Sequence, residues 1–198
     1  MVSADFSDAY TQSKLIDLQR AIEKLGLIVH WPVENISLCI KLAELTFNNC
    51  YFETPEGIHR QSQGFPMGGH SSREGLDTIL LASEIDLLKT PGLDTYLKSY
   101  MRLVDDVSLI ANTKFSNLRQ LITLLGTHYP RSMPLNIQIS FGYSQFLDVH
   151  ITNVYPKEEI GKFSTSLAYK PLAQFDFTTY DSNVSPTYKG KTWSDIRV

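Results

Sequence analysis

The chain has 198 residues, of which 42% are hydrophobic, and its formal net charge is -3 at pH 7. This length and apolar content suit one domain with a buried core, or one domain plus a short appendage. No stretch has the character of a membrane span and no signal peptide opens the chain, so we expect an intracellular protein without a membrane partner. The acidic balance argues against a self-sufficient nucleic-acid enzyme, because basic surface normally binds the phosphates.

The first predicted element is a short strand that ends in a polar turn, Val2-Ser3-Ala4-Asp5-Phe6-Ser7-Asp8-Ala9-Tyr10. This strand carries Asp5 in an apolar setting. An ionised carboxylate is rarely buried unless it is paired or holds a cation. Asp5 is therefore a candidate metal ligand.

Two helices and a hairpin are predicted next. Over residues 14–25 one helical face carries Leu15, Leu18, Ile22 and Leu25, and Gly26 is well placed to end this helix. A second helix is predicted over residues 35–49. Residues 51–53 and 58–60 then form a predicted hairpin around a Pro-Glu-Gly turn.

A glycine-rich loop follows, Gln63-Gly64-Phe65-Pro66-Met67-Gly68-Gly69-His70-Ser71-Ser72, and it leads into a helix predicted from about residue 71 to 88. Glycines allow the backbone to approach a ligand closely, and a helix N-terminus favours phosphate. Glycine-rich loops also occur as plain connectors. Alone, this motif leaves both interpretations open.

Two adjacent aspartates, Asp105 and Asp106, stand inside an apolar run. A tight hairpin between strands over residues 101–104 and 107–111 would place both carboxylates at one exposed tip. Like charges that close repel each other, which makes a divalent metal ion their natural partner. Asp is also a common turn residue, so a hairpin tip without a metal remains the alternative.

The last predicted elements are a helix over residues 117–125 and strands over residues 135–140 and 145–153. Asp148 lies in the second of these strands, and we expect it to have a structural role. The order strand, helix, strands, helix, strand indicates an α+β fold of the ferredoxin-like kind. Its antiparallel sheet would carry helices packed on one face.

Taken in order, these motifs resemble the palm domain of reverse transcriptases. The segment from Asp5 to Tyr10 is similar to the first catalytic motif in its retroviral form, Asp-x-x-Asp-Ala-Tyr. Residues 63–72 resemble the loop-helix motif, and residues 103–106 resemble the double-aspartate hairpin. Residues 146–151 and 165–171 resemble the segments after the palm in Penelope-like retroelements.

The resemblance implies a polymerase palm over residues 1–155, followed by a post-palm segment and a loosely ordered tail over residues 156–198. It also implies an RNA-directed DNA polymerase that extends a DNA primer on an RNA template with deoxynucleoside triphosphates. The cofactor would be two Mg²⁺ ions, with Mn²⁺ as a substitute. Asp5 and Asp105 would bind these ions, with Asp106 as the accessory carboxylate and Phe6 as a ligand through its backbone carbonyl.

The same resemblance assigns substrate contacts. The amides of Asp8 and Ala9 would face the incoming triphosphate, and Tyr10 would stack under the sugar and exclude a 2′-hydroxyl. Gln63 and Gly64 would touch the nucleotide and the templating base pair. Residues 146–149 would lie near the primer 3′ end.

Departures from the family pattern keep a second class of function open. Leu103 replaces the usual tyrosine before the double aspartate, and Lys114 is a candidate proton donor to pyrophosphate by position only. The family's basic fingers precede the first motif, at which this chain starts, so we expect a fragment whose fingers and thumb belong to a parent polyprotein. The alternative is a catalytically inactive palm remnant that at most binds nucleic acid or protein. Tyr10 disfavours a third alternative, an RNA-directed RNA polymerase.

Overall fold

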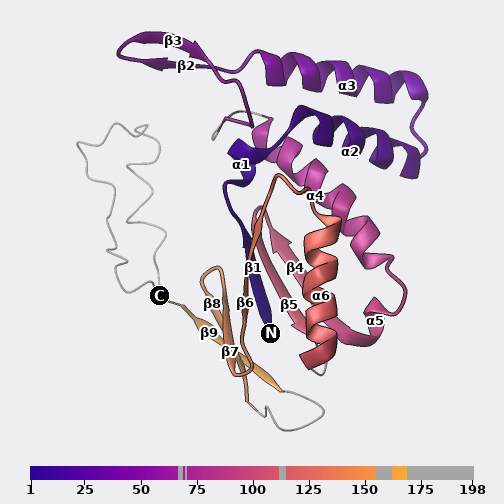
Figure 1. Ribbon diagram of the computed structural model, residues 1–198, viewed down its shortest axis with the longest axis vertical. Helices are drawn as coiled ribbons and strands as arrows, with labels where there is room; N and C mark the ends of the chain where they lie inside the picture. Colours follow the sequence, from indigo (N-terminus) through magenta and orange to yellow (C-terminus); the bar gives the residue numbers. More distant parts are fainter. Residues whose placement is uncertain (67–68, 70, 112–114, 155–161, 169–198) are drawn as a thin grey trace, which may run out of the picture.

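The computed structural model describes residues 1–66, 69, 71–111, 115–154 and 162–168. Within these residues, the centre of the molecule is a four-stranded antiparallel sheet in the order β4-β5-β1-β6 (Figure 1). Its strands are β1 (Val2–Phe6), β4 (Leu97–Leu103), β5 (Asp106–Ala111) and β6 (Leu135–Ile139). Two helices, α4 (Ser72–Leu88) and α6 (Phe115–His128), connect them in the order β1-α4-β4-β5-α6-β6. This arrangement is ferredoxin-like, and the predicted α+β fold is confirmed.

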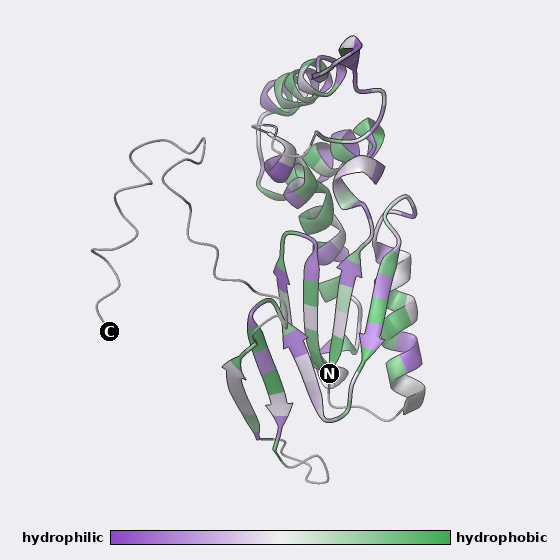
Figure 2. Ribbon diagram, turned by 90° about the vertical axis from the view of Figure 1, so that its left-hand side faces the viewer, coloured by the Kyte–Doolittle hydropathy of each residue, from purple (hydrophilic) through white to green (hydrophobic). Residues whose placement is uncertain are grey.

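The hydrophobic core lies between one face of the sheet and these two helices (Figure 2). Strand side chains alternate between faces, and β1 buries Val2, Ala4 and Phe6, each at most 5% exposed. They share one core cluster with leucines of α4 and α6. Ser3 and Asp5 therefore point to the opposite face of the sheet, which no helix of this core covers.

A helical layer extends the molecule beyond the sheet (Figure 1). After the single turn of α1 (Ala9–Gln12), α2 (Leu15–Ile28) packs on α4, and α3 (Val33–Asn48) packs on α2. The expectation that Gly26 ends the first long helix is wrong. Gly26 is buried at the crossing with α3, where an added Cβ would lie 2.6 Å from Cγ1 of Ile36. The glycine serves the close approach of two helices, and the chain turns only at His30, whose φ is 56°.

The predicted hairpin after α3 is confirmed as β2 (Tyr51–Thr54) and β3 (Gly57–Arg60). A short helix, α5 (Leu93–Tyr96), precedes β4. In the described part of the chain, no helix combines the length and apolar character that crossing a bilayer requires. The predicted intracellular location stays a prediction.

A second sheet contains β7 (Tyr143–Phe146), β8 (Val149–Asn153) and β9 (Phe163–Leu167). The single strand predicted over residues 145–153 is wrong, because Leu147 and Asp148 form a turn between β7 and β8. β9 pairs with β8, so residues on both sides of position 155 belong to this sheet. The predicted roles of residues 67–68, 70, 114 and 169–198 fall outside the described residues.

Candidate active site

All three predicted catalytic residues, Asp5, Asp105 and Asp106, lie at one end of the central sheet. The register of β1 and β5 pairs Asp5 with Asp106. Asp106 also pairs with Leu103, which leaves Val104 and Asp105 as the turn between β4 and β5. The amide of Phe6 donates to the carbonyl of Asp105 at 3.2 Å, which fixes this turn against the end of β1.

One detail of the prediction is wrong. Asp106 does not share the hairpin tip with Asp105, because it is the first residue of β5. A strand position beside β1 directs Asp106 to the same face as its partner Asp5. The two neighbouring aspartates therefore occupy different settings, one at the turn and one on the open face of the sheet.

The electrostatics of this site disfavour a fully ionised state. Desolvation and, second, the charge of Asp105 raise the pKa of Asp5. A bound cation would relieve this repulsion. No group of three or more His, Cys, Asp or Glu side chains in the described residues is arranged to hold a metal ion. Mg²⁺ typically binds through one or two carboxylates together with water and substrate phosphates, so a pair such as Asp5 and Asp105 has the donor chemistry for it.

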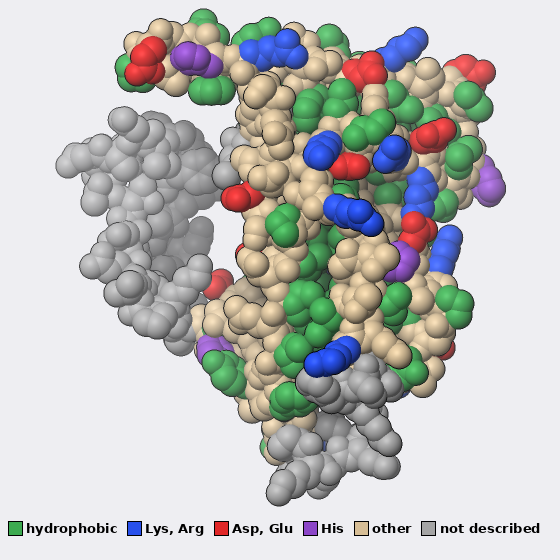
Figure 3. All heavy atoms as spheres, in the orientation of Figure 1, with side chains coloured by type: hydrophobic (Ala, Val, Ile, Leu, Met, Phe, Trp, Pro, Cys, Tyr) green, Lys and Arg blue, Asp and Glu red, His purple; other side chains and the backbone are tan. Residues whose placement is uncertain are grey.

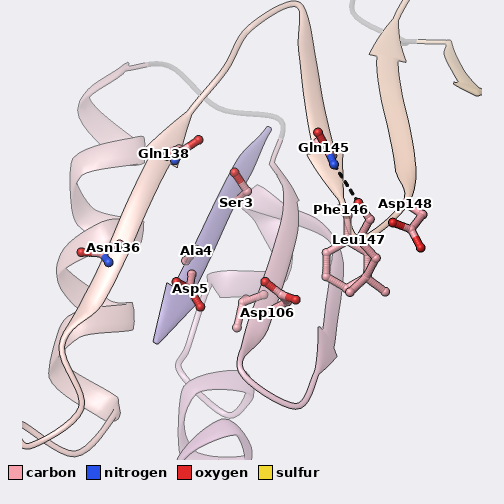
Figure 4. Close-up of a pocket in the computed structure, with 11 residues that line it drawn as sticks. Ser3, Ala4, Asp5, Asp106, Asn136, Gln138, Gln145, Phe146, Leu147 and Asp148 are labelled. Atoms are coloured by element: carbon pink, nitrogen blue, oxygen red, sulfur yellow. Dashed lines mark hydrogen bonds between the residues drawn. The ribbon is translucent and has the colours of Figure 1, made fainter. Parts of the chain in front are cut away.

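A pocket of about 610 Å³ opens beside the carboxylates on the uncovered face of the sheet (Figure 4). Asp5 and Asp106 lie on one side, and the β7–β8 turn with Phe146 and Asp148 lies across from them. Residues 146–149 were predicted to lie near a primer end, and those of them that line the pocket do approach the carboxylates. Whether a primer occupies this pocket stays a prediction.

Sequence reasoning missed two residues of the pocket wall, Asn136 and Gln138 of β6. The register places them opposite Asp5 and Ser3, so amides and carboxylates share one polar face. Asn136 donates to the hydroxyl of Ser7 at 2.6 Å. The alternation of Asn and Gln with aliphatic residues in Leu135–Ile139 is the signal that could have identified this face.

The predicted nucleotide-binding residues surround α1, next to the aspartate turn. Asp8, which precedes α1, has φ 53° and ψ 36°. Burial, followed by the charges of Asp105 and Asp77, raises the pKa of Tyr10, so Tyr10 is within electrostatic reach of the turn. The side chain of Phe6 is in the core, packed edge-on against Tyr129 with ring centroids 4.7 Å apart. Only the backbone of Phe6 is therefore left to contact a ligand, and its role as a metal ligand stays a prediction.

The glycine-rich loop contacts this same region through Gly64. The amide of Phe65 donates to the carbonyl of Tyr10 at 2.7 Å. Gly64 has φ 74°, and an added Cβ would lie 2.5 Å from the carbonyl oxygen of Tyr10. A side chain is thus excluded both by conformation and by space. Gln63 beside it is exposed and lines a small pocket with Thr11 of α1, so the structure places Gly64 against the backbone of Tyr10 and Gln63 beside the next residue of α1.

No protein-family model and no curated protein matches the chain. Two solved structures resemble it: apo telomerase from Candida tropicalis truncated from the C-terminal domain, with 17% identity and a TM-score of 0.54, and apo telomerase from Candida tropicalis, with 15% identity and a TM-score of 0.52. Each match covers 76% of this chain, which spans only 33% and 31% of the telomerase chains. At such low identity the likeness concerns the fold. The chain therefore has an α+β fold similar to that of part of telomerase, a reverse transcriptase.

Proposed function

We propose that this chain is the palm of an RNA-directed DNA polymerase related to the reverse transcriptases of Penelope-like retroelements. The observation that supports this proposal is the meeting of Asp5 and Asp105 at one end of a ferredoxin-like sheet, where they repel each other beside a polar pocket. In the proposal, both carboxylates hold Mg²⁺ ions, with Asp106 as the accessory carboxylate and the carbonyl of Phe6 as a further ligand. Such ions lower the pKa of the primer 3′-hydroxyl and neutralise charge on the leaving pyrophosphate.

The chain's own residues would orient the substrates. The amides of Asp8 and Ala9 would receive the triphosphate, and Tyr10 would lie under the sugar and favour deoxynucleotides. The contact between Gly64 and the backbone of Tyr10 supports a shared nucleotide site for α1 and the glycine-rich loop. Catalysis by such a site is mostly positioning and electrostatics.

The primer terminus would occupy the pocket between the sheet and the β7–β8 turn. Its wall offers the amides of Asn136 and Gln138, which can donate to sugar and base-edge oxygens. An RNA–DNA hybrid exposes such acceptors in its wide, shallow minor groove. Contact with a primer would explain why Asn136 and Gln138, which are not part of the core, are polar.

Binding of the duplex would need more positive charge than the visible face offers. On the face shown in Figure 3, lysine and arginine side chains alternate with acidic and hydrophobic ones instead of forming a stripe. Phosphate contacts dominate nucleic-acid affinity. In this function, fingers and thumb of a parent polyprotein would supply most of the contacts to the phosphates of the template and primer.

Extension of a DNA primer on an RNA template in Mg²⁺ or Mn²⁺ tests this function. The chain would be assayed alone and with fingers joined ahead of Met1, each also as Asp105→Asn. The matched control is Asp94→Asn, which neutralises an exposed aspartate of α5. We expect the control to retain activity and Asp105→Asn to lose about 100-fold or more.

Inactivity of every form, with folding confirmed by circular dichroism, would overturn the polymerase proposal. The inactive palm remnant would then account better for the same fold. Retained activity in Asp105→Asn would instead show that the turn is not the catalytic centre.

A further inference from the structure

Arg102 lies in β4 just before the aspartate turn, and its side chain is only 11% exposed. Its register partner is the core residue Val107, so it points toward the helices. The guanidinium donates to Glu84 of α4 and, through Nη1, to Asp77 at 2.6 Å. The same nitrogen donates to the carbonyl of Val104 at 2.8 Å. One buried cation thus joins α4 to the turn that carries Asp105.

Glu84, which binds this cation, is itself held by other side chains. The side chain of Glu84 is 7% exposed and also accepts hydrogen bonds from the hydroxyls of Tyr100 and Tyr129. Burial raises the pKa of both tyrosines, so they remain protonated donors. For Arg102, burial alone would lower the pKa, but the hydrogen bonds to Glu84 and Asp77 raise it overall. Arg102 therefore stays a cation, and both tyrosines stay hydrogen-bond donors.

The turn needs such support because of its backbone. Val104 has φ 55°, in the left-handed region that β-branched residues disfavour. Its carbonyl points to Arg102, and the next residue is Asp105. Strained backbone at a functional site persists only when the surroundings hold it.

We propose that Arg102 is a positioning residue for a metal-binding turn: through the carbonyl of Val104 it sets the orientation of Asp105. This inference rests on the proposed function, because the orientation matters only if Asp105 holds an ion. Arg102 is on the helix-facing side of the sheet and acts through Val104. Groups that orient metal ligands typically change metal affinity by 10- to 100-fold when they are removed.

The network also reaches the nucleotide side of the site. Asp77 accepts from Arg102 and interacts electrostatically with Tyr10. It pairs in addition with the exposed Arg73 at 3.8 Å. Arg102 therefore contacts both parts of the proposed site. It binds Asp77, which interacts with Tyr10 on the nucleotide side, and it binds the turn that carries the metal ligand Asp105.

The test needs variants that keep the fold. Arg102→Met alone would leave Glu84 as a buried charge without its cation. On a Glu84→Gln background, which retains hydrogen bonding to the tyrosines, we compare Arg102, Arg102→Met and Arg102→Gln. Glutamine keeps one donor for the Val104 carbonyl, in the way that Gln145 donates to the carbonyl of Leu147. Arg20→Met, which removes an exposed arginine of α2, is the matched control.

Two measurements on the full chain separate positioning from general stability. Titration with Mn²⁺, followed by electron paramagnetic resonance, should show a dissociation constant about tenfold or more higher in Glu84→Gln/Arg102→Met than in Glu84→Gln. The Arg102→Gln variant should fall between them, and Arg20→Met should match wild type. Amide hydrogen exchange should accelerate in peptides that contain residues 103–106 but not in β7 and β8.

Unchanged Mn²⁺ affinity in Glu84→Gln/Arg102→Met would overturn the inference, and so would faster exchange spread evenly over the chain. If the wild-type chain itself binds no Mn²⁺, the proposed metal function fails. Hydrogen exchange then decides whether Arg102 positions the turn: selective acceleration at residues 103–106 supports positioning, and its absence rejects it.

Discussion

The β4–β5 and β7–β8 hairpins have turns of the same kind in different surroundings. Each turn consists of an apolar residue followed by Asp, and the first turn residue has φ 55° at Val104 and 54° at Leu147. In each hairpin, the side chain two positions earlier donates to the carbonyl of that residue. Arg102 does so at 2.8 Å and Gln145 at 2.9 Å.

What differs is how the donor is held. Arg102 is largely buried and bound to two carboxylates of α4, whereas Gln145 is exposed on a small sheet. Both donors lie on edge strands, β4 and β7, so the position of the strand in its sheet is not what distinguishes them. The comparison teaches that local sequence can set the shape of a turn, but the rigidity of that turn depends on what packs beneath it.

The largest expected effect is on the free energy of unfolding, when the side-chain donor of each hairpin, Arg102 or Gln145, is removed. Arg102→Met leaves the buried Glu84 without its cation and should lower the free energy of unfolding by about 3 to 5 kcal/mol. Gln145→Met removes one neutral, exposed hydrogen bond and should lower it by no more than about 1 kcal/mol. Urea unfolding of both variants measures the difference, and equal losses would erase the distinction between the two hairpins.

Neutralising the two turn aspartates should sharpen the contrast in metal binding. With Mn²⁺ at 100 times its dissociation constant, ligation should stabilise the wild-type chain by about 2.7 kcal/mol. We expect this gain to vanish in Asp105→Asn and persist in Asp148→Asn, as read from melting temperatures with and without Mn²⁺. Loss of the gain in Asp148→Asn alone would place the ion at the β7–β8 turn instead.

The smallest effect concerns pH in metal-free buffer. The pKa of Asp5 is raised above its ordinary 3.8, so the folded state holds this proton more tightly than the unfolded state. The resulting stability is present below pH 3.8 and is lost as pH rises through the raised pKa. Asp5→Asn should therefore stabilise the chain at pH 7 by a few tenths to about 1 kcal/mol, whereas Asp148→Asn should not.

Urea midpoints at pH 3 and pH 7 test this sign. A gain for Asp5→Asn that is the same at both pH values would show that the cost of ionising Asp5, from desolvation and the charge of Asp105, is not its cause. Destabilisation at pH 7 would show that the ionised form of Asp5 contributes to folding.

Elements with a local signal could be predicted, but their junctions could not. The apolar periodicity of residues 14–25 indicates a helix, but the sequence alone does not show that the helix continues past Gly26, because the contact that requires a glycine there is with Ile36 of another helix. The turn at Leu147 and Asp148 has Asp as its one common turn residue and no Gly, Asn or Pro, so apolar alternation around it indicates a single strand. Only the pairing of Phe146 with Val149 reveals it.

The candidate site divides in the same way. Asp5, Asp105 and Asp106 stood out because charges in apolar runs are visible in the sequence. The carboxylates that anchor Arg102 come from α4, and sequence spacing does not show that Glu84 and Arg102 meet. Residue pairs brought together only by tertiary packing carry no local pattern.

The position of β1 in the sheet has a consequence for biosynthesis. This first strand pairs with β5 and β6, so Val2 cannot pair until its partners Leu109 and Ile139 have been synthesised. At a synthesis rate of about 5 to 20 residues per second, the second partner emerges roughly 7 to 30 seconds later. Until β5 emerges, β1 has no strand to pair with and its apolar face stays uncovered, which makes the nascent chain a candidate client for chaperones. Asp5 can face Asp106 only after β5 has been synthesised, about 100 residues after β1, so the aspartates cannot come together early in synthesis.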